Sequence, residues 1–531
     1  MALISTTKLA KQIIHMDITI LWADDEIELL KPHILFLEGK DYRVLTANNG
    51  EDAIDLLNEN QVDIVFLDEN MPGISGLETL NRMKSTHPST PIIMITKSEE
   101  EEIMEDAIGS KISDYLIKPV NPKQILLSIK KNLDTRRLVS EKTTSNYQQE
   151  FRKIGMRLMD RLDVEEWKEV YEQMVYWEME LDSSNDSGMQ EVLQMQKTEA
   201  NAQFGKFISD NYTDWVSGTD EDAPLMSHQV IKDRVFPVLE DSHQPVFLVV
   251  IDNLRLDQWR ALRPIFENYF RVDEEDTFFS ILPTATHYAR NALFAGMMPL
   301  DIQRMFPNLW KDEDGDGKNS HEADFLENLM KRSGVNKKMS YNKVTNLRFG
   351  KKLADNFQNF MTNDLNVIVY NFVDMLSHAR TEMEVIRELA SDESAYRSLT
   401  VSWFEHSPLF DLFKSIAEAK CKVVITTDHG TVRVNSASKV IGDRNTNTNL
   451  RYKIGKNLDF REKDVFYSRS PEELMLPKSN VSSTWIFALE DKFFAYPNNY
   501  NHYVKYYKDT FQHGGVSLEE MIVPLVTLSP K

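Results

Sequence analysis

The N-terminal quarter of the chain alternates between short apolar runs and amphipathic stretches. The apolar runs are ITILW from Ile18, YRVLTA from Tyr42, VDIVFLD from Val62, PIIMIT from Pro91 and YLIKP from Tyr115. Such runs, separated by helical segments like Glu26–Glu38 and Glu51–Asn58, are typical of parallel βαβ units whose strands are buried on both faces. The pattern predicts one doubly wound α/β domain of about 120 residues, a size within the usual range for a single domain.

Beyond Lys123 the pattern changes to that of long helices. Apolar residues recur at three- and four-residue steps, which predicts a helix with one buried face. The residues of this stripe are Trp167, Val170, Tyr171, Met174, Trp177 and Leu181. The cluster Ser183–Gly188 ends this helix, and a second helical stretch covers Met189–Ile208. We expect a helical bundle that couples two domains, with a surface for docking a partner as the alternative.

Buried-strand signatures return in the C-terminal half. They are VFLVVID from Val246, LNVIVYNFVD from Leu365 and CKVVITTDHG from Cys421, and an acidic residue follows each apolar run. In an open parallel sheet, ligands bind outside the carboxyl ends of the strands. We therefore expect Asp252, Asp374 and Asp428 to converge on one crevice of a second α/β domain.

A length of 531 residues supports this division, because single hydrophobic cores stop growing at roughly 250–300 residues. The expected boundaries are 16–134 for the first α/β domain, 135–232 for the helical connector and 233–531 for the second α/β domain. Residues 1–15 are given no role.

Composition and charge narrow the class of protein. The chain carries 61 basic and 83 acidic side chains, a net charge of −22, which opposes general adsorption to DNA or to anionic lipid. No apolar run approaches the ~18 residues that a membrane span requires, and the N-terminus lacks the apolar block of a secretory signal. We expect a cytoplasmic protein without membrane insertion. The single cysteine, Cys421, forms no internal disulfide and is expected to be a small core residue.

Five polar residues follow successive strands of the first predicted domain. They are Asp24, Asp25, Asp68, Thr96 and Lys118, and the parallel topology places them at one edge of the sheet. Clustered carboxylates attract a hard cation such as Mg²⁺, and the cation together with Lys118 offsets the charge of an incoming phosphate. Asp68 is then the nucleophile that forms an aspartyl phosphate, whose oxygen Thr96 bonds.

This stretch resembles the receiver domain of response regulators. The resemblance implies that Asp24 and Asp25 hold Mg²⁺, that Asp68 is phosphorylated by a sensor histidine kinase, and that Asn70 adds a backbone carbonyl ligand. It assigns the switch to Thr96, Tyr115 and Lys118, and it implies a homodimer favoured by phosphorylation. Receivers usually carry a small residue where Lys97 stands, so the rate of phosphorylation and the lifetime of the phosphoryl group are left open.

The second α/β domain contains a set of potential metal ligands. The motifs are Asp374-x-x-x-His378, Asp428-His429 and His513 in QHGG, together with Asp252 and the segment PTATHYAR. Imidazole and carboxylate are ligands that zinc favours, and two groups of this kind suit two ions about 4 Å apart. Residues four apart on a helix face the same side, so Asp374 and His378 are expected to share one ion.

Here the chain resembles the alkaline phosphatase superfamily, in particular the PglZ-type domains related to nucleotide pyrophosphatases/phosphodiesterases. The resemblance implies that one Zn²⁺ is bound by Asp252, Asp428 and His429 and the other by Asp374, His378 and His513. A bridging hydroxyl is the nucleophile. Of Thr284 and Thr286, the P-T-x-T pattern favours Thr286, which would contact both ions. His287 and Tyr288 replace the aromatic-proline pair of those enzymes, so the substrate wall differs.

Formal charges discriminate between substrates. Two Zn²⁺ ions carry four positive charges, while three carboxylates and one alkoxide carry four negative charges, so the centre is nearly neutral. A nearly neutral centre suits a singly charged phosphodiester better than a dianionic monoester. Arg290, four residues after Thr286, is either a phosphate contact or a residue of the helix surface.

Two weaker signals remain. Asp312, Asp314, Asp316 and Gly317 echo the start of a calcium-binding EF-hand loop, but Ala323 stands where the bidentate glutamate is needed, so calcium is not expected. The loop DRNTNTNLRYKIGK interleaves basic residues with polar ones, namely Arg444, Arg451, Tyr452, Lys453 and Lys456. It either grips a nucleotide or oligonucleotide, or is a solvated loop.

The whole arrangement resembles the PorX-type response regulators associated with the type IX secretion system of Bacteroidetes. We expect a two-component regulator in which phosphorylation controls a zinc phosphodiesterase acting on nucleotide or oligonucleotide diesters. The resemblance implies the secretion machinery or a sigma factor as partners. The alternative is a catalytically silent adaptor whose zinc-binding domain docks such partners. A DNA-binding activator is disfavoured because no helix-turn-helix is recognised and the charge is strongly negative.

Overall fold

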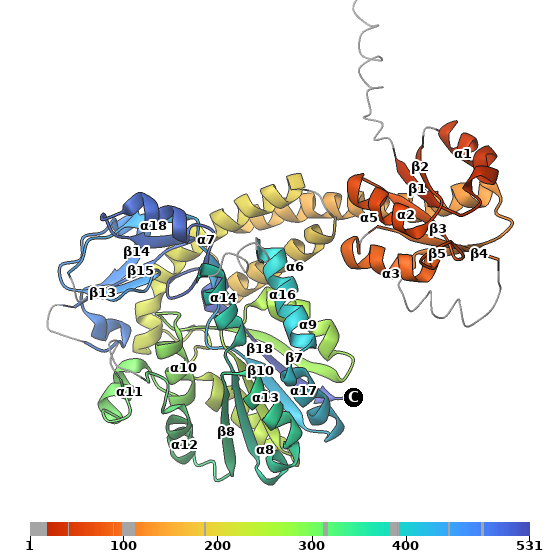
Figure 1. Cartoon of the computed structure of the whole chain (residues 1–531). Helices are drawn as coiled ribbons and strands as arrows, with labels where there is room; N and C mark the ends of the chain where they lie inside the picture. The colour runs from red at the N-terminus through yellow and green to blue at the C-terminus, as the bar shows by residue number, and fades with distance from the viewer. Residues whose placement is uncertain are drawn as a thin grey trace, which may run out of the picture. The chain divides into compact units, whose positions relative to one another are not determined.

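A computed structural model describes residues 18–40, 42–88, 90–97, 112–184, 187–311, 317–382, 390, 392–443, 446–478 and 483–531. The chain divides into two compact units, Met1–Ser145 and Asn146–Lys531. Figure 1 shows the elements of each. The division falls within the helix α5 (Pro122–Arg157).

The first unit is built on a parallel sheet with the strand order β2-β1-β3-β4-β5. Its strands are β1 (Thr19–Ala23), β2 (Arg43–Ala47), β3 (Ile64–Asp68), β4 (Ile92–Thr96) and β5 (Asp114–Ile117), and its helices include η2 (Ile27–Leu30), α1 (Lys31–Glu38), α2 (Gly50–Glu59) and α3 (Gly76–Thr86). The central strands β1, β3 and β4 are buried throughout. Their side chains fill one core on each face of the sheet, so the predicted doubly wound fold is confirmed.

Two long helices follow α5. They are α6 (Val164–Ser184) and α7 (Ser187–Ser217). Every residue of the predicted apolar stripe on α6 is buried, as the helical spacing required. The stripe belongs to the same core as the sheet of the second unit, and α6 packs directly on α9 (Leu256–Phe266). The connector is therefore packed as part of the second unit.

The second unit contains a six-stranded sheet with the order β7-β18-β10-β6-β9-β8. The strands are β6 (Val246–Ile251), β7 (Phe270–Phe279), β8 (Met339–Val344), β9 (Leu365–Tyr370), β10 (Lys422–Thr426) and β18 (Ile522–Pro530). The three predicted strands β6, β9 and β10 are parallel neighbours, as expected, whereas β18, which the sequence patterns did not predict, runs antiparallel to both β10 and β7. The reason is local: β18 begins soon after His513, at the carboxyl edge of the parallel strands, and so must run back across the sheet.

Further helices and short strands surround this sheet (Figure 1). The helices are η3 (Ile231–Val235), α8 (Phe236–Asp241), α10 (Thr286–Ala295), α11 (Pro299–Met305), α12 (Glu322–Arg332), α13 (Leu347–Asp355), η4 (Phe357–Thr362), α14 (Phe372–Glu382), α16 (Glu393–Glu405), α17 (Pro408–Glu418), η5 (Glu462–Asp464), η6 (Pro471–Leu474), α18 (Tyr500–Tyr507) and α19 (Leu518–Met521). The short strands are β11 (Val432–Arg433), β12 (Ser436–Lys439), β13 (Tyr452–Gly455), β14 (Val465–Ser468), β15 (Thr484–Ala488), β16 (Lys492–Ala495) and β17 (Phe511–Gln512).

Two expectations about single features can be compared with this fold. Cys421 is fully buried, as predicted for a core thiol. None of the helices in the described part of the chain combines the length and the apolar composition that crossing a bilayer requires. The EF-hand-like residues Asp312, Asp314 and Asp316 lie outside the described residues.

Two basic residues of the loop after the DHG segment differ from both expectations. Arg451 is fully buried, and its Nη2 donates to Glu520 Oε2 at 2.6 Å. Lys453 is also buried; its Nζ donates to the carbonyl of Asn447 at 2.8 Å and lies 4.9 Å from the ring centre of Tyr496. These cations are neither solvated nor free to grip a nucleotide. Arg444 lies outside the described residues, and Lys456 is exposed.

A buried charge network joins α6 to the helices α9 and α16 of the second unit. Arg397 of α16 donates through Nη1 to Glu178 Oε1 of α6 and to Asp257 Oδ2 of α9, each at 2.8 Å, and it also pairs with Asp182. Burial alone would raise the pKa of Glu178. The positive charges of Lys197 and Arg397 outweigh this effect and lower the pKa to about 2. Sequence patterns do not reveal such a network, because its members lie far apart along the chain.

Replacing Arg397 by alanine tests how much this network stabilises the second unit. The substitution removes one of the two cations paired with each of the buried carboxylates Glu178 and Asp257, and the cation paired with Asp182. We therefore expect Arg397→Ala to lower the free energy of unfolding by about 3–5 kcal/mol. Urea unfolding followed by tryptophan fluorescence measures the change. The exposed pair of Lys331 with Glu327 provides a control, and Lys331→Ala should change the same quantity by less than about 1 kcal/mol. Equal effects of the two substitutions would contradict the assignment.

The buried amine of Lys453 predicts an unusual pH dependence of stability. Burial lowers the pKa of this amine to about 7, whereas it titrates near 10.4 in an unfolded chain. Between these two pH values Lys453 is protonated in the unfolded state and deprotonated in the folded state. Its contribution therefore lowers the free energy of unfolding further as the pH falls from about 10 toward 7. Lys453→Met should therefore stabilise the second unit more at pH 7 than at pH 9, by about 2 kcal/mol.

Urea unfolding at the two pH values measures this difference. Lys456→Met, in the same loop but exposed, is the matched control and should show no such pH-dependent gain. An identical effect of Lys453→Met at both pH values would show that the amine is charged in the folded protein.

Candidate metal centre and phosphoacceptor site

The first unit gathers three carboxylates and one amine at the carboxyl edge of its sheet. Ligand atoms of Asp24, Asp25 and Asp68 lie within 4.8 Å of one another. Lys118 Nζ lies 2.9 Å from Asp24 Oδ2 and 2.8 Å from Asp68 Oδ1. Asp24 and Asp68 are buried while Asp25 is exposed, so the cluster is open to solvent on one side. The ends of β1 and β3 bring the two buried carboxylates together.

Burial raises the pKa of Asp68 above its usual value, and the carboxylates of Asp24 and Asp25 add to this effect against the hydrogen bond from Lys118. Burial alone would lower the pKa of Lys118, but its bonds to Asp68 and Asp24 outweigh this, and the pKa is raised. The amine is therefore charged at neutral pH. A cation with oxygen ligands fits this cluster, because carboxylates outnumber the one amine by three to one.

The residues assigned to the receiver switch occupy different surroundings. Thr96 ends β4, and its hydroxyl donates a hydrogen bond to the carboxylate of Glu69. Tyr115 is 39% exposed, and Asn70 is exposed next to Glu69. Lys97 Nζ lies 3.6 Å from Glu26 Oε2, with both side chains largely exposed. Neither glutamate contact was expected from the sequence, since Glu69 and Glu26 resemble ordinary loop carboxylates.

The second unit gathers two clusters at the carboxyl edge of its parallel strands. Ligand atoms lie within 4.8 Å of one another in each of two sets, Asp252, Asp428 and His429, and Asp374, His378 and His513. Asp252 follows β6 directly, and Asp428 lies two residues after β10. Asp374 does not end a strand, because β9 stops at Tyr370; it lies in the first turn of α14, one turn before His378. The structure thus brings together all six predicted ligands.

The two histidines at the centre of the site direct Nδ1 at backbone carbonyls and Nε2 at the neighbouring carboxylates. His429 Nδ1 lies 3.0 Å from the carbonyl oxygen of Gly430, and His513 Nδ1 lies 3.1 Å from that of Thr284. A carbonyl only accepts, so each Nδ1 carries the proton, and the lone pair is on Nε2 in the neutral ring. The rings stack with their centres 4.3 Å apart. Burial, together with His429 and His378, keeps the pKa of His513 well below its usual value.

This arrangement fits metal ions. His513 Nε2 faces Asp374 Oδ1 at 3.7 Å, a pairing of two acceptors that a cation between them would satisfy. Asp428 Oδ2 is buried and accepts no hydrogen bond among the described residues. Burial raises the pKa values of Asp252 and Asp374 to about 6. Buried carboxylates and neutral imidazoles with open lone pairs are the ligand set of zinc and similar ions.

Thr286 lies between the ligands at the N-terminus of α10. Its Oγ1 is 3.1 Å from His429 Nε2 and 3.4 Å from Asp252 Oδ1. Thr284, the other candidate, is fully buried and points elsewhere: its hydroxyl donates to the Gly515 carbonyl at 2.9 Å and accepts from Gly514 N at 3.0 Å. The geometry therefore favours Thr286 as the hydroxyl of this site and gives Thr284 a role in holding the HGG turn.

Arg290 differs from both sequence expectations. It is 1% exposed, and its Nη1 donates to Asp252 Oδ2 at 2.6 Å while its Nε donates to Glu322 Oε1 at 2.6 Å. It is neither on a helix surface nor directed at a substrate, because α10 is buried on all sides. Instead it occupies one oxygen of Asp252 and leaves the other facing Thr286. Glu322, which cancels its charge, was not found from the sequence.

Asn253 links the two clusters. Its backbone N donates to Asp428 Oδ1 at 3.3 Å, and its Nδ2 donates to Asp374 Oδ1 at 3.4 Å. It adopts a φ of 66°, a left-handed conformation that asparagine tolerates better than most residues. The sequence offered one indication of this role, an asparagine directly after a strand-ending aspartate. That pattern alone is too common to identify a functional residue.

The aromatic neighbours of Thr286 pack inward. The ring of His287 stacks on Trp310 with centres 4.9 Å apart, and Tyr288 meets Trp485 edge to face at 5.4 Å. A further acidic cluster, Glu178, Asp257 and Glu393, is crossed by arginine side chains and is therefore part of the buried charge network.

Three family models match the chain in succession. The response regulator receiver domain matches residues 20–130, the PorX response regulator linker domain matches residues 137–216, and the BREX system PglZ alkaline phosphatase-like domain matches residues 230–528. The last of these covers more than half of the 531 residues.

Individual relatives match a smaller part. The transcriptional regulatory protein ZraR of Klebsiella oxytoca is 32% identical over 26% of this chain and 31% of that protein. The transcriptional regulatory protein SrrA of Staphylococcus aureus is 32% identical over 21% of this chain and 46% of that protein. The chain thus spans less than half the length of these curated relatives.

Among solved structures, a CheY-like receiver domain protein from Methanospirillum hungatei is 26% identical and covers 22% of this chain and 94% of its own, with a TM-score of 0.22. The chemotaxis protein CheY4 of Vibrio cholerae is 28% identical and covers 22% of this chain and 97% of its own, with a TM-score of 0.21. The chain belongs to the PglZ alkaline phosphatase-like family, and its succession of receiver, linker and PglZ-type domain is that of a PorX-type response regulator.

Proposed function

We propose that this two-component regulator, phosphorylated on Asp68 by a histidine kinase, controls a two-zinc phosphodiesterase in its output domain. The observation that carries the proposal is the position of Thr286, whose hydroxyl lies 3.1 Å from His429 Nε2 and 3.4 Å from Asp252 Oδ1 in one carboxylate–histidine cluster, where the ring of His429 stacks on that of His513 from the other cluster. The proposed domains are the receiver 16–134, the connector 135–232 and the output domain 233–531.

The ligand roles follow the two clusters. Asp252, Asp428 and His429 would hold one Zn²⁺, and Asp374, His378 and His513 the other, with Thr286 shared between them. Bound zinc would supply positive charge that lowers the proton affinity of the hydroxyl and stabilises the leaving oxygen. Arg290 keeps Asp252 oriented by holding Oδ2. In the receiver, Asp24, Asp25, Asp68 and the carbonyl of Asn70 would hold Mg²⁺, and Thr96, Tyr115 and Lys118 would respond to phosphorylation.

The reaction we propose has two steps. Thr286 Oγ1 gives its proton to water and attacks phosphorus. The bond from phosphorus to one ester oxygen breaks, that oxygen takes a proton from water and leaves as an alcohol, and Thr286 carries the remaining phosphoryl ester. A water then attacks the same phosphorus and releases Thr286 with the phosphomonoester product. The start of α10 favours the developing negative charge on Oγ1, because the helix dipole is positive at its N-terminus.

The charge of the site favours a diester of a nucleotide or an oligonucleotide. Three carboxylates and an alkoxide balance two zinc ions, and the buried pair of Arg290 with Glu322 adds no net charge. A singly charged diester therefore adds one negative charge to a nearly neutral site. A dianionic monoester would add two. As partners we propose the type IX secretion machinery or a sigma factor, and we propose a homodimer favoured by phosphorylation.

Removing the hydroxyl tests the catalytic assignment. After defined zinc loading, Thr286→Ala should hydrolyse a chromogenic phosphodiester at least about 1000-fold more slowly than the wild type, because loss of a nucleophile removes the covalent route. Asp374→Ala should lose both activity and one zinc ion, while Thr286→Ala keeps its zinc. Thr362→Ala is the matched control, because this exposed threonine lies before the start of β9, whereas Asp374 follows the other end of that strand.

Equal activity in wild type, Thr286→Ala and Asp374→Ala would refute the assignment and favour the silent adaptor. A preference for the matching phosphomonoester would overturn the charge argument and leave the site intact.

The receiver assignment has its own test. With Mg²⁺ and acetyl phosphate, the wild type should gain the mass of one phosphoryl group and, by light scattering, shift toward the dimer. Asp68→Asn should do neither, because an amide oxygen is a poor nucleophile, while Asp55→Asn on the exposed side of α2 should behave as the wild type. If Asp68→Asn gains the phosphoryl group to the same extent, Asp68 is excluded as the acceptor. If the molar mass of the phosphorylated wild type by light scattering is unchanged, the dimer is excluded.

A further inference from the structure

The single-turn helix α19 lies between the connector helix α7 and the metal ligands. Its first residue, Leu518, comes five positions after His513. Two neighbouring side chains of this turn point to opposite partners: Glu519 bonds to α7, and Glu520 bonds to the turns that carry the histidine ligands. Both carboxylates are buried, so each must be paired within the protein.

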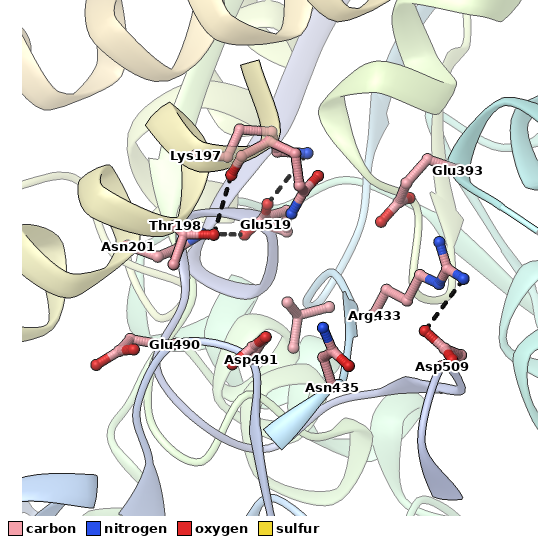
Figure 2. Close-up of a pocket in the computed structure, with 12 residues that line it drawn as sticks. Lys197, Thr198, Asn201, Glu393, Arg433, Asn435, Glu490, Asp491, Asp509 and Glu519 are labelled. Carbon is pink, nitrogen blue, oxygen red and sulfur yellow. Dashed lines mark hydrogen bonds and ion pairs between the residues drawn. The ribbon is translucent and has the colours of Figure 1, made fainter. Parts of the chain in front are cut away.

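On the connector side, Asn201 uses both ends of its amide. Its Oδ1 accepts from Leu518 N at 2.8 Å, and its Nδ2 donates to Glu519 Oε2 at 3.1 Å. Lys197, one turn earlier, lies 3.4 Å from Glu519 Oε1 and donates to Glu178 Oε2 at 2.7 Å. Figure 2 shows Lys197 and Asn201 beside Glu519. We call this group of contacts the α7 clamp.

On the metal side, Glu520 holds the HGG turn. Its Oε1 accepts from Gly515 N at 2.9 Å, and its Oε2 accepts from Ser517 Oγ at 2.7 Å. Thr284 fixes the same turn by accepting from Gly514 N, and its carbonyl orients the ring of His513. A displacement of α19 therefore reaches His513 through the backbone of its own turn.

The same helix also meets the DHG segment. The carbonyl of Glu520 accepts from Gly430 N at 3.0 Å, next to His429. A Cβ atom at Gly430 would lie 1.9 Å from the carbonyl oxygen of Glu519, so only glycine permits this approach. The backbone of α19 is thus in direct contact with the segments that carry ligands of both clusters.

A cavity of about 190 Å³ lies beside the α7 clamp. Its walls are polar, and they include Lys197, Asn201 and Glu519 together with Glu393, Arg433 and Asp509 (Figure 2). Arg433 belongs to β11 and is paired in register with Phe511 of β17, so the ribbon that joins the DHG and HGG segments forms part of the wall. The polar clamp therefore lies at the edge of this cavity, beside the apolar core that Ala200 and Phe204 of α7 share with Leu518 of α19.

We propose that Asn201 and Lys197 of the connector are positioning residues of the metal centre, which act through α19 to place His513 and His429. This inference rests on the proposed function, and it names the route by which the connector regulates that site. A shift of α7 relative to α19 would leave the buried charges of Lys197 and Glu519 unpaired. It would also move the turns that carry His513 and His429, whose positions determine the affinity for metal. Outer partners of metal ligands typically change metal affinity about 10–100-fold when removed.

A reciprocal exchange of polarity tests the clamp in the full-length protein. Asn201→Asp places a carboxylate against Glu519, and it should weaken zinc binding about tenfold and alter the visible spectrum of the cobalt-loaded protein. Combining Asn201→Asp with Glu519→Gln restores a donor–acceptor pair with reversed direction, so the double variant should recover zinc affinity to within about threefold of wild type. On a phosphodiester, kcat should fall in Asn201→Asp with a smaller change in KM.

Gln194→Glu is the matched control, because it adds the same charge to the same helix and cavity two turns earlier without contacting α19. It should behave as the wild type. Circular dichroism establishes that each variant is folded, and Asn201→Ala replaces Asn201→Asp if the latter does not fold.

The outcomes separate this inference from the proposed function. If the wild type binds neither zinc nor cobalt, the metal centre itself is refuted. If the wild type binds both and Asn201→Asp has the same zinc Kd and the same cobalt spectrum, the clamp does not position the centre. A loss of unfolding stability with an unchanged spectrum likewise overturns the inference, because a purely structural residue produces that result.

Discussion

Repulsion between buried carboxylates is the constraint that organises the second unit. Asp252 and Asp428 are fully buried, and Asp374 lies beside them at the same edge of the sheet. Two like charges about 4 Å apart repel by roughly 4 kcal/mol even at an effective dielectric constant of 20. Arg290 offsets part of this from behind Asp252, and Asn253 donates to both of the other carboxylates. The remaining negative charge faces Thr286 and the imidazole lone pairs, which is where a cation fits.

The backbone topology explains why these carboxylates meet despite their repulsion. Strands β6, β9 and β10 are parallel neighbours, so the chain segments that leave them emerge at one edge. The large apolar core beneath this sheet, shared with α6 and α7, supplies the stabilisation that holds the charged edge together. Function and packing are thus coupled, since the connector helices help to build the core that supports the site.

Period and spacing along the sequence were sufficient for most of the fold, and together with the family resemblance they identified the candidate metal ligands. Apolar runs located the buried strands, the Trp167–Leu181 stripe located the buried face of α6, and the DxxxH and DHG spacings located ligands that the structure brings together. Strand β18 was not predicted; its apolar run contains Pro524, a residue that normally argues against a strand inside a sheet. The buried cations Arg290, Arg451 and Lys453 were missed because a basic residue is normally exposed, and its burial depends on partners such as Glu322 and Glu520 that are distant in sequence.

The two sites of the chain use the same kind of sheet edge for different chemistry, and the position of the cation makes the difference. In the receiver, Lys118 bonds to Asp68 itself, so the amine remains beside the carboxylate that we propose as the phosphoryl acceptor. In the output domain, Arg290 bonds to the far oxygen of a proposed ligand and leaves the nucleophile to Thr286. An acyl phosphate on a carboxylate is a reactive mixed anhydride, whereas a phosphate ester on a hydroxyl is stable unless it is activated. Transient storage of a signal therefore suits the first arrangement, and the second would support repeated turnover once the surrounding carboxylates and imidazoles hold the metal ions that we propose.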